Sequence, residues 1–436
     1  MKDKLSTESY KGVRDFYPED MFIQDYIFGI MSSTAERFGY QKYDASILEP
    51  AELYRAKTGE EIVNEQTYTF TDRGDREVTL RPEMTPTVAR MIARKQREIP
   101  LPIRWYSIPN LFRYEQPQKG RLREHYQLNV DIFGVPSIEA DIEIIQTAHT
   151  IMTNFGAEQQ DFSVYVNSRK IINTLYDVFD FEEEKRHKIS KLIDKKEKIP
   201  KVDFEDMITD ICGDTSKDFL KTISSTKNII AKIGENNEQL REIIHIIETL
   251  SKLGITNVTF SPLLMRGFDY YTGVVFEVFD NSKENNRSLF GGGRYDDLLS
   301  IFGREKIPAF GFGMGDVTIR DFLSTHNLLP TYKPQTDVMI CIADDTPFES
   351  ISKITSDLRA SGINVAIDFS RKKIADQIKR AEKKSIPYII CIGKNEIDSN
   401  NFTLKELATR KTTLGDVFDL AKVISDKKEL TQKLSN

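Results

Sequence analysis

Hydrophobic residues near the start of the chain recur at helical spacing and then change to the shorter period of strands. Between residues 20 and 38, apolar side chains return every three or four positions, which is typical of an amphipathic helix. From about 40 to 135, short runs such as 77–80 and 128–133 predict strands. A second helix is predicted near 138–154, followed by a strand at 162–166.

The middle of the chain has a different composition. Residues 170–255 are rich in Lys, Glu, Asp and Ile with few glycines, which predicts a helical insertion. The strand pattern returns at 274–279 and continues to a glycine run at 311–315. Pro330 and Pro334 then interrupt the pattern, as expected for a connector.

Beyond this connector, strands and helices alternate regularly. Strands are predicted at 338–342, 363–367 and 388–392, with helices between them near 347–360 and 371–384. This βαβαβ order predicts a separate small α/β domain.

Length and composition limit the class of protein. A chain of 436 residues exceeds the usual size of one compact core, so two to four domains are expected. Its net charge of −6 predicts no general affinity for nucleic acid or anionic membranes, so any RNA contact requires a local basic patch. Residues 1–4 lead into polar sequence, and no apolar run is long enough to span a bilayer, which favours a cytoplasmic location.

The three cysteines, Cys212, Cys341 and Cys391, lie far apart, and no pair has the spacing of zinc ligands. Cys341 and Cys391 stand inside predicted strands. Reduced core cysteines are therefore expected.

The first candidate for chemistry is the segment 112–127, which predicts a strand, a polar loop and a second strand. Arg113 stands where the first strand ends, and the loop adds Lys119, Arg121 and Arg123. From charge alone, a solvated hairpin loop is the favoured interpretation.

The second strand favours a ligand-binding site over a solvated hairpin loop. By two-residue alternation, Gln127, Asn129 and Asp131 share one face, whereas the apolar residues between them share the other. The polar face continues the basic loop, so it suits a wall that lines a ligand.

Two further stretches, 266–273 and 291–297, each combine an arginine with tyrosine, aspartate and glycine. Glycine allows a close approach of the backbone to a ligand, and arginine (here Arg266 and Arg294) offers a planar fork to phosphate or carboxylate. Such residues suit a small zwitterion held beside a phosphate. Alternatively, Tyr270 and the residues after it are simply the core of a strand.

Together these segments resemble the histidyl-tRNA synthetases, a family of class II aminoacyl-tRNA synthetases. Segment 112–127 is similar to motif 2 of that class. The resemblance implies that Arg113 holds the α-phosphate of ATP and that Glu115 holds its adenine end. Gln118 and Lys119 would meet the acceptor end of the tRNA.

The resemblance also implies a histidine pocket. Residues 80–86 resemble the histidine-binding strand of the family, with Glu83 and Thr85 facing the α-amino group. Arg266 would stabilise charge near the α-phosphate, as a catalytic residue together with Arg113. The implied histidine contacts are Glu83, Thr85, Gln127, Asp131, Tyr270, Tyr271 and Tyr295.

The implied fold class is a multidomain α/β protein with an antiparallel-sheet class II catalytic core. Residues 20–50 resemble motif 1, which implies a homodimer. The C-terminal α/β domain resembles an anticodon-binding domain; its basic helix near 371–384 suits RNA phosphates, or is an exposed amphipathic helix. The expected boundaries are 1–169 and 256–328 for the core, 170–255 for the helical insertion, 329–336 for a linker and 337–436 for the C-terminal domain.

The chain departs from the family at motif 3, which the glycine run 311–315 resembles. Val317 and Thr318 stand where Glu and Arg are expected, so the arginine that contacts the γ-phosphate is missing from its position. Asp316, near the start of the predicted helix, would repel phosphate. We expect Arg121 or Arg123, with Mg²⁺, to cover the γ-phosphate instead. Asp131 is a second departure, because glutamate is usual there.

Two functions fit this resemblance. The first is a histidine–tRNA ligase that uses ATP to form histidyl-adenylate and transfers histidine to tRNA(His). The second is a non-catalytic histidine sensor, such as the regulatory subunit of ATP phosphoribosyltransferase. Arg113, Arg266 and the C-terminal domain favour the ligase, since a pure sensor does not need them.

Overall fold

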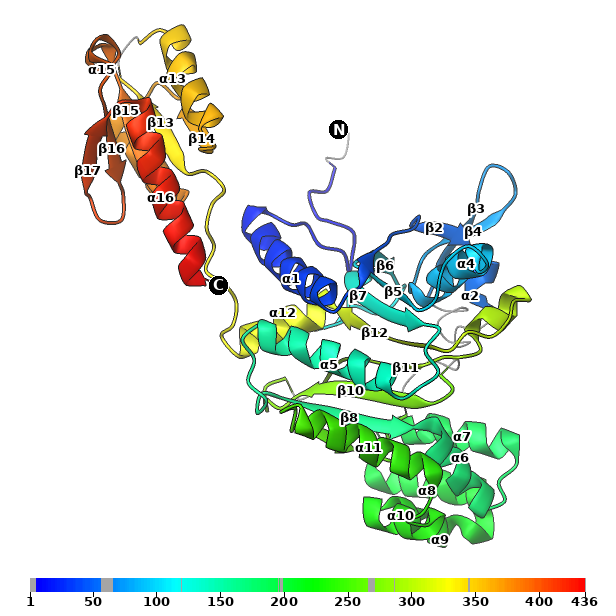
Figure 1. The fold of residues 1–436 in the computed structure, drawn as a ribbon. Helices are drawn as coiled ribbons and strands as arrows, with labels where there is room; N and C mark the ends of the chain where they lie inside the picture. The colour runs from blue at the N-terminus through cyan, green and yellow to red at the C-terminus, as the bar shows by residue number, and fades with distance from the viewer. Residues whose placement is uncertain are drawn as a thin grey trace. The chain divides into compact units, whose positions relative to one another are not determined.

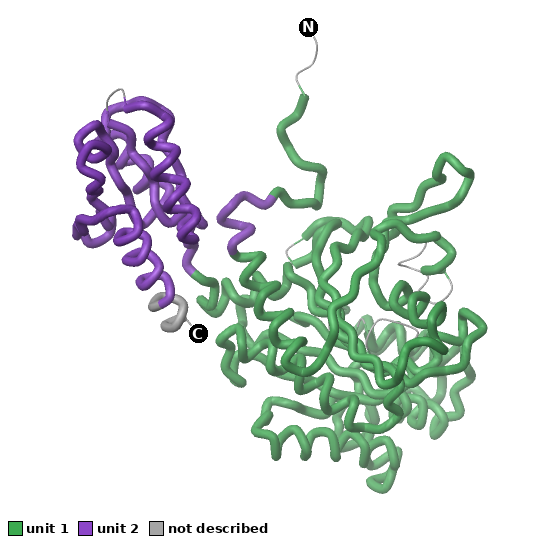
Figure 2. The backbone as a smooth tube through the Cα atoms, turned by 45° about the horizontal axis from the view of Figure 1, so that its top comes forward, with its two compact units in different colours: residues 1–15, 23–330 green, residues 16–22, 331–436 purple. Residues whose placement is uncertain are grey.

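The computed structural model describes residues 5–55, 66–118, 120–194, 196, 199–265, 271–285, 287–343 and 346–435, with side chains to 429. The chain divides into two compact units (Figure 2): residues 1–15 with 23–330, and residues 16–22 with 331–436. None of the helices within the described ranges has the length and apolar character that crossing a bilayer requires.

The first unit is built on a nine-stranded sheet (Figure 1). Neighbouring strands within this sheet run antiparallel, except at the two edges, where β1 pairs with β5 and β8 pairs with β9 in parallel. In spatial order the strands are β1 (Gln41–Lys42), β5 (Ile103–Ser107), β7 (Glu124–Phe133), β12 (Ala309–Gly315), β11 (Ser288–Arg294), β10 (Val274–Asp280), β8 (Phe162–Ser168) and β9 (Val258–Phe260), and β6 (Asn110–Phe112) pairs with β7. The antiparallel core predicted for the fold class is thus present.

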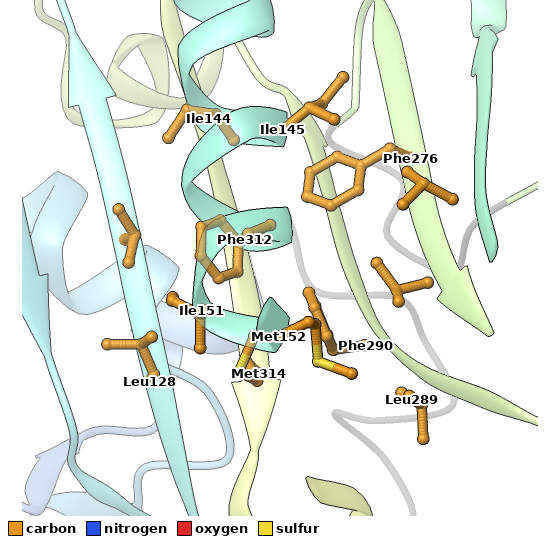
Figure 3. Packing of buried hydrophobic residues seen from close by; sticks show 14 of the residues in the cluster. Leu128, Ile144, Ile145, Ile151, Met152, Phe276, Leu289, Phe290, Phe312 and Met314 are labelled. Carbon is orange, nitrogen blue, oxygen red and sulfur yellow. The ribbon is translucent and has the colours of Figure 1, made fainter. Parts of the chain in front are cut away.

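Helices cover one face of this sheet. They are α1 (Pro18–Arg37), α5 (Glu139–Asn154), α11 (Glu238–Lys252) and α12 (Asp316–Thr325). Leu128 of β7 and Phe312 of β12 share one buried cluster with Ile144 and Met152 of α5 (Figure 3), and Val130 of β7 belongs to the same cluster. The period of two along each strand sends these apolar residues to the helices.

The same period sends small and polar residues to the opposite face. Gly311 and Gly313 of β12 lie in register with Asp131 and Asn129 of β7, and Gly291 of β11 pairs with Gly313. Because three neighbouring positions lack side chains, this face is hollow beside the polar residues of β7.

A small three-stranded sheet stands beside the main one, in the order β2 (Leu48–Pro50), β4 (Glu77–Leu80) and β3 (Tyr68–Thr71). In the chain, the helix α2 (Glu52–Arg55) follows β2, and the helix α4 (Thr85–Lys95) follows β4. This sheet leads directly into residues 81–85, which reach the hollow face.

The described part of the segment predicted as a helical insertion consists of helices joined by short connections. Its helices are α6 (Arg169–Val178), α7 (Glu183–Asp194), α8 (Lys201–Cys212), the 3₁₀ turn η2 (Gly213–Thr215), α9 (Ser216–Ile223) and α10 (Thr226–Ile233). They share a core of their own around Tyr176, Phe204 and Phe219. In contrast, Ile243 and Ile246 of α11 pack into the core of the main sheet. A second 3₁₀ turn, η3 (Leu298–Phe302), follows β11.

The second unit contains the predicted βαβαβ alternation and more. Its sheet has the order β14 (Val365–Asp368), β13 (Val338–Ile342), β15 (Tyr388–Ile392), β16 (Phe402–Glu406) and β17 (Thr412–Gly415). The first three are parallel, and β16 and β17 add an antiparallel extension that the sequence pattern did not reveal. Its helices are α13 (Phe348–Ala360), α14 (Ile374–Lys383), α15 (Lys394–Ser399) and α16 (Val417–Ser435).

The cysteines are free thiols within or beside the cores. Cys341 and Cys391 are register partners on the parallel strands β13 and β15, and Cys212 is buried in the helical segment. The expectation of reduced core cysteines agrees with these positions.

Candidate active site

A cavity opens on the hollow face of the main sheet. Most of the residues that the sequence assigned to histidine or to the α-phosphate line it together. They are Glu83, Thr85, Arg113, Gln127, Asp131, Tyr271 and Tyr295.

The wall formed by β7 confirms the predicted alternation. Gln127, Asn129 and Asp131 line the cavity, while Leu128 and Val130 belong to the apolar core on the other face. The strand therefore separates a ligand-lining surface from the packed layer of helices.

Asp131 and Tyr295 form the closed end of the cavity. The Tyr295 hydroxyl donates a hydrogen bond to Oδ1 of Asp131, and both side chains are buried. The other oxygen, Oδ2, is buried without a hydrogen-bond partner in the described part of the chain. An unsatisfied buried carboxylate oxygen is costly unless a ligand or water donates to it.

Burial raises the pKa of Asp131 to about 7, and the bond from Tyr295 opposes this shift by favouring the charged form. The carboxyl group is thus close to changing its charge at neutral pH.

Glycines create the space beside these polar side chains. A Cβ atom on Gly311 would stand 2.1 Å from Oδ1 of Asp131, and one on Gly313 would stand 1.8 Å from Nε2 of Gln127. Any side chain at either position would displace a predicted histidine contact. The glycine run therefore shapes the cavity as well as the strand.

Arg113 reaches the cavity from the end of β6. Its Nε donates to the carbonyl oxygen of Pro82 at 3.0 Å, so the arginine is fixed beside the segment that carries Glu83 and Thr85. Glu83 is buried and Thr85 begins α4. One cavity thus holds two acidic side chains and one guanidinium, a charge pattern that matches a zwitterion next to a phosphate.

The remaining loop residues lie elsewhere. Glu115, Gln118 and Arg121 line a second hollow together with Gln66 and Tyr114. Arg121 forms an ion pair with Glu115 at 2.9 Å and is 57% exposed.

Arg123 belongs to neither hollow. Its guanidinium lies 4.1 Å from the ring centre of Tyr114 and donates to the Glu115 carbonyl oxygen and to the Tyr10 hydroxyl, each at 3.1 Å. These contacts hold the base of the loop against the N-terminal segment.

The third residue of α12 is Thr318, which carries no positive charge that could bind a phosphate. The Thr318 hydroxyl donates to the carbonyl oxygens of Leu289 and Gly315, at 2.8 and 3.1 Å. The buried Asp316, which the sequence suggested would repel phosphate, is charge-paired: its Oδ2 accepts from Arg14 at 2.7 Å and from Gln24 at 2.9 Å.

Three predicted site residues, Lys119, Arg266 and Tyr270, lie outside the described residues. One expectation from the second glycine-rich stretch was wrong. Arg294 does not serve the cavity but crosses to the helical face, where it pairs with the buried Asp141 of α5. The alternation along β11 explains this, since Arg294 is one residue out of phase with Gly293 and Tyr295.

Some site features carried only a weak sequence signal. Asn129 and the strand glycine Gly291 line the cavity without having been assigned a ligand. His125 shares the phase of Gln127 along β7; burial, followed by the charges of Arg113 and Arg14, lowers the pKa of its imidazole to about 3. Two-residue alternation identified this face but not the individual contacts.

Comparison with known proteins agrees with this geometry. The family model "Histidyl-tRNA synthetase" matches residues 12–317, and the model "Anticodon binding domain" matches residues 337–427. A histidine–tRNA ligase of Leptospira biflexa is 45% identical over 94% of this chain and 95% of its own length. One from Thermoplasma volcanium is 36% identical over 95% of this chain and 98% of its length.

Solved structures show the same fold. The histidyl-tRNA synthetase of Nostoc sp. PCC 7120 superposes with a TM-score of 0.81 at 21% identity, covering 97% of this chain and all of that one. A protein from Bacillus halodurans described as an ATP phosphoribosyltransferase regulatory subunit/histidyl-tRNA synthetase gives 0.72 at 24% identity, covering 87% of this chain and 97% of its own. The family match over most of the chain, with relatives similar along nearly their whole length, places this chain in the histidyl-tRNA synthetase family.

Proposed function

We propose that this protein is a histidine–tRNA ligase that activates histidine with ATP and transfers it to the 3′ end of tRNA(His). The observation that carries the proposal is that Glu83, Asp131 and Arg113 line one cavity together with Gly291, Gly311 and Gly313. A sensor of histidine alone would need the carboxylates but not a guanidinium positioned for phosphate.

We assign the histidine to the end of the cavity closed by Asp131 and Tyr295. The α-ammonium group would be held by Glu83 and Thr85, and a donor of the substrate would satisfy Oδ2 of Asp131, which has no partner in the described residues. Gln127 and Tyr271 would complete the contacts, together with Tyr270. Charge-assisted hydrogen bonds to a buried carboxylate make this end selective for a cation.

The reaction would take place where the substrate carboxylate reaches Arg113. A carboxylate oxygen of histidine attacks the α-phosphorus of ATP, the bond from that phosphorus to the bridging oxygen breaks, and pyrophosphate leaves. Arg113, with Arg266, would stabilise the charge that develops on the α-phosphoryl oxygens. The terminal ribose hydroxyl of tRNA then attacks the carbonyl carbon of the adenylate and releases AMP.

The other loop residues are proposed to serve ATP and tRNA. Glu115, Arg121 and Arg123 would hold ATP, and Gln118 and Lys119 would meet the tRNA acceptor end. Mg²⁺ would neutralise the leaving pyrophosphate. Glu277 of β10, the register partner of Gly291, is the candidate carboxylate for it, since Mg²⁺ commonly takes one or two carboxylates plus substrate phosphates.

The second unit is proposed to bind the anticodon arm, with the basic residues on and before α14 as its RNA contact. We further propose a cytoplasmic homodimer and the domain boundaries predicted from the sequence. The resemblance to motif 1 supports the dimer.

Histidine-dependent exchange of labelled pyrophosphate into ATP tests the proposal. The wild-type protein should catalyse exchange and charge tRNA(His), and Arg113→Ala should lower kcat at least 100-fold while leaving histidine binding nearly intact. The matched control is Arg97→Ala, which changes an exposed arginine in the turn just after α4. Histidine binding without exchange in the wild type would instead indicate the sensor function.

A further inference from the structure

The negative charges of the ATP triphosphate need positively charged partners at one end of the cavity. Three phosphoryl groups need cations, yet the first turn of α12 has Thr318 where the family places an arginine, and its hydroxyl is bonded to main-chain oxygens. A cation at another position would have to replace it.

Strand register shows where that end lies. Along β7, Asp131, Asn129 and Gln127 pair with Gly311, Gly313 and Gly315 of β12 in turn. If histidine occupies the Asp131 end and its carboxylate meets Arg113, the phosphates extend past Gln127. They would leave the sheet beyond Gly315, where β11 begins and α12 starts.

We propose that Arg287, the residue immediately before β11, supplies the missing cation and binds the β- and γ-phosphates of ATP. Its guanidinium forms an ion pair with Asp321 of α12, three residues after Thr318 and therefore on the same face of the helix. Thr318 in turn donates to the carbonyl oxygen of Leu289, two residues after Arg287. The guanidinium of Arg287 thus lies close to the helix position that lacks its own arginine.

A second contact places this guanidinium against the loop between β6 and β7. A Cβ atom on Gly120 would stand 2.1 Å from Nη1 and 2.5 Å from Cζ of Arg287, so the glycine backbone is in direct contact with the guanidinium. Gly120 is the tip of the segment that resembles motif 2, and its φ of +73° favours glycine. Arg287 therefore lies between the segments that resemble motifs 2 and 3.

The backbone that carries Arg287 is firmly held. The Asp280 N–H donates to its carbonyl oxygen at 3.1 Å, and the Asp280 side chain accepts from Ser282 N–H and Asn285 Nδ2, each at 2.8 Å. The side chain is 27% exposed, which leaves it accessible to a ligand. An arginine whose main chain is held by hydrogen bonds and whose guanidinium is partly exposed is suited to bind phosphate.

Three other arginines of this region have different partners. Arg14 neutralises the buried Asp316, and Arg123 lies over Tyr114. Arg121 pairs with Glu115 and is mostly exposed. It remains a candidate for the same phosphates, and the experiment below separates it from Arg287.

The assignment rests on the proposed function and is tested by comparing two ligands. ATP carries the β- and γ-phosphates, whereas a histidyl-sulfamoyl-adenosine analogue carries neither. Arg287→Ala should weaken ATP binding and lower kcat/KM for ATP about 10- to 100-fold, as expected for one or two charge-assisted hydrogen bonds. Its affinity for the analogue and its KM for histidine should change less than about twofold.

Further variants test the role of the Arg287 side chain more strictly. Arg287→Lys should lose less than Arg287→Ala, because a point charge replaces the fork. Lys283→Ala, an exposed residue of the same β10–β11 connection, should behave as wild type. The double variant Arg287→Ala/Thr318→Arg should recover part of the ATP affinity, because it restores the cation on the same helix face.

Several outcomes would overturn the assignment. Equal weakening of ATP and the analogue would indicate a purely structural role, and normal exchange with impaired transfer to tRNA would place Arg287 at the acceptor end. An effect on ATP from Arg121→Ala but none from Arg287→Ala would assign the phosphates to Arg121. If the wild type shows no exchange, the proposed function fails, and the ATP-binding comparison still decides the role of Arg287.

Discussion

The hydroxyl of Tyr295 donates a hydrogen bond to Oδ1 of Asp131, and this contact joins the residue that follows β11 to the C-terminal part of β7 at the candidate histidine site. One carboxylate oxygen is thereby fixed, and the other is buried without a partner in the described residues. Asp131 is thus oriented before any ligand arrives.

This contact predicts how histidine binding depends on pH. Burial raises the pKa of Asp131 to about 7, and the ionised form is needed to attract a cationic substrate, so affinity should fall as pH drops below 7. Tyr295→Phe removes a hydrogen bond that favours the ionised form. The pKa of Asp131 should then rise, and the midpoint of the binding profile should move to higher pH.

Calorimetric titration of histidine between pH 5.5 and 8.5 measures that midpoint. The substrate imidazole titrates in the same range, but identically for both proteins, so the difference between wild type and Tyr295→Phe isolates the protein group. An unchanged midpoint would show that Asp131 does not control the profile.

The same carboxyl group should reduce the stability of the ligand-free protein at neutral and alkaline pH. The pKa of Asp131 is near 3.9 in an unfolded chain but about 7 in the folded one, so between these values the folded state binds the extra proton. The stabilisation is fully present below about pH 3.9 and is lost as pH rises through 7.

Asp131→Asn should therefore unfold less readily than wild type at pH 8, by on the order of 3 kcal/mol, and the advantage should shrink towards pH 5. Urea unfolding at pH 5, 6, 7 and 8 gives the comparison. A difference that is independent of pH would contradict the raised pKa. Histidine binding should be lost in the same variant, so stability and function would move in opposite directions.

Gly313→Ala should impair histidine binding while leaving the fold intact. The new Cβ would stand 1.8 Å from Nε2 of Gln127, the far end of a flexible side chain that can move away. KM for histidine should rise about tenfold or more, because a polar contact is lost. Gly29→Ala, an open helical position with nothing within 4 Å, should instead stabilise the protein by about 0.5–1 kcal/mol. An unchanged KM in Gly313→Ala would remove Gln127 from the site.

Much of this site was accessible from the sequence because it depends on alternation along strands. Residues 124–133 form one continuous strand, so the phase of Gln127, Asn129 and Asp131 could be read directly and was confirmed. The phase of β11 was equally readable, but the expectation for Arg294 came from residue type alone and was wrong. Its partner Asp141 lies 153 positions away on α5.

Contacts between distant segments explain what the sequence did not show. The pairing of Arg287 with Asp321 and Gly120 depends on how β11, α12 and the loop meet, and no local pattern encodes it. The strands β16 and β17 were missed for a different reason. They are short, and β17 is mostly exposed, so their apolar period is weak.

Asp316 should be among the polar residues on which stability depends most. Its Oδ2 accepts from Arg14 and Gln24, and its Oδ1 accepts from the Tyr126 N–H at 2.9 Å. Asp316→Ala would leave a half-buried guanidinium and a main-chain donor without their acceptor. The free energy of unfolding should fall by about 3–5 kcal/mol, the range for breaking a buried ion pair from one side.

Asp316→Asn separates charge from hydrogen bonding at the same position. The amide oxygen can still accept one of these bonds, so the loss should be smaller, about 1–3 kcal/mol. Asp25→Ala, an exposed acidic residue on α1, should change stability by less than about 0.5 kcal/mol and serves as the control. Equal losses in the alanine and asparagine variants would mean that the charge of Asp316 dominates. Losses within the range of the control would refute the role of Asp316, since three donors from Arg14, Gln24 and Tyr126 would then be held equally well without it.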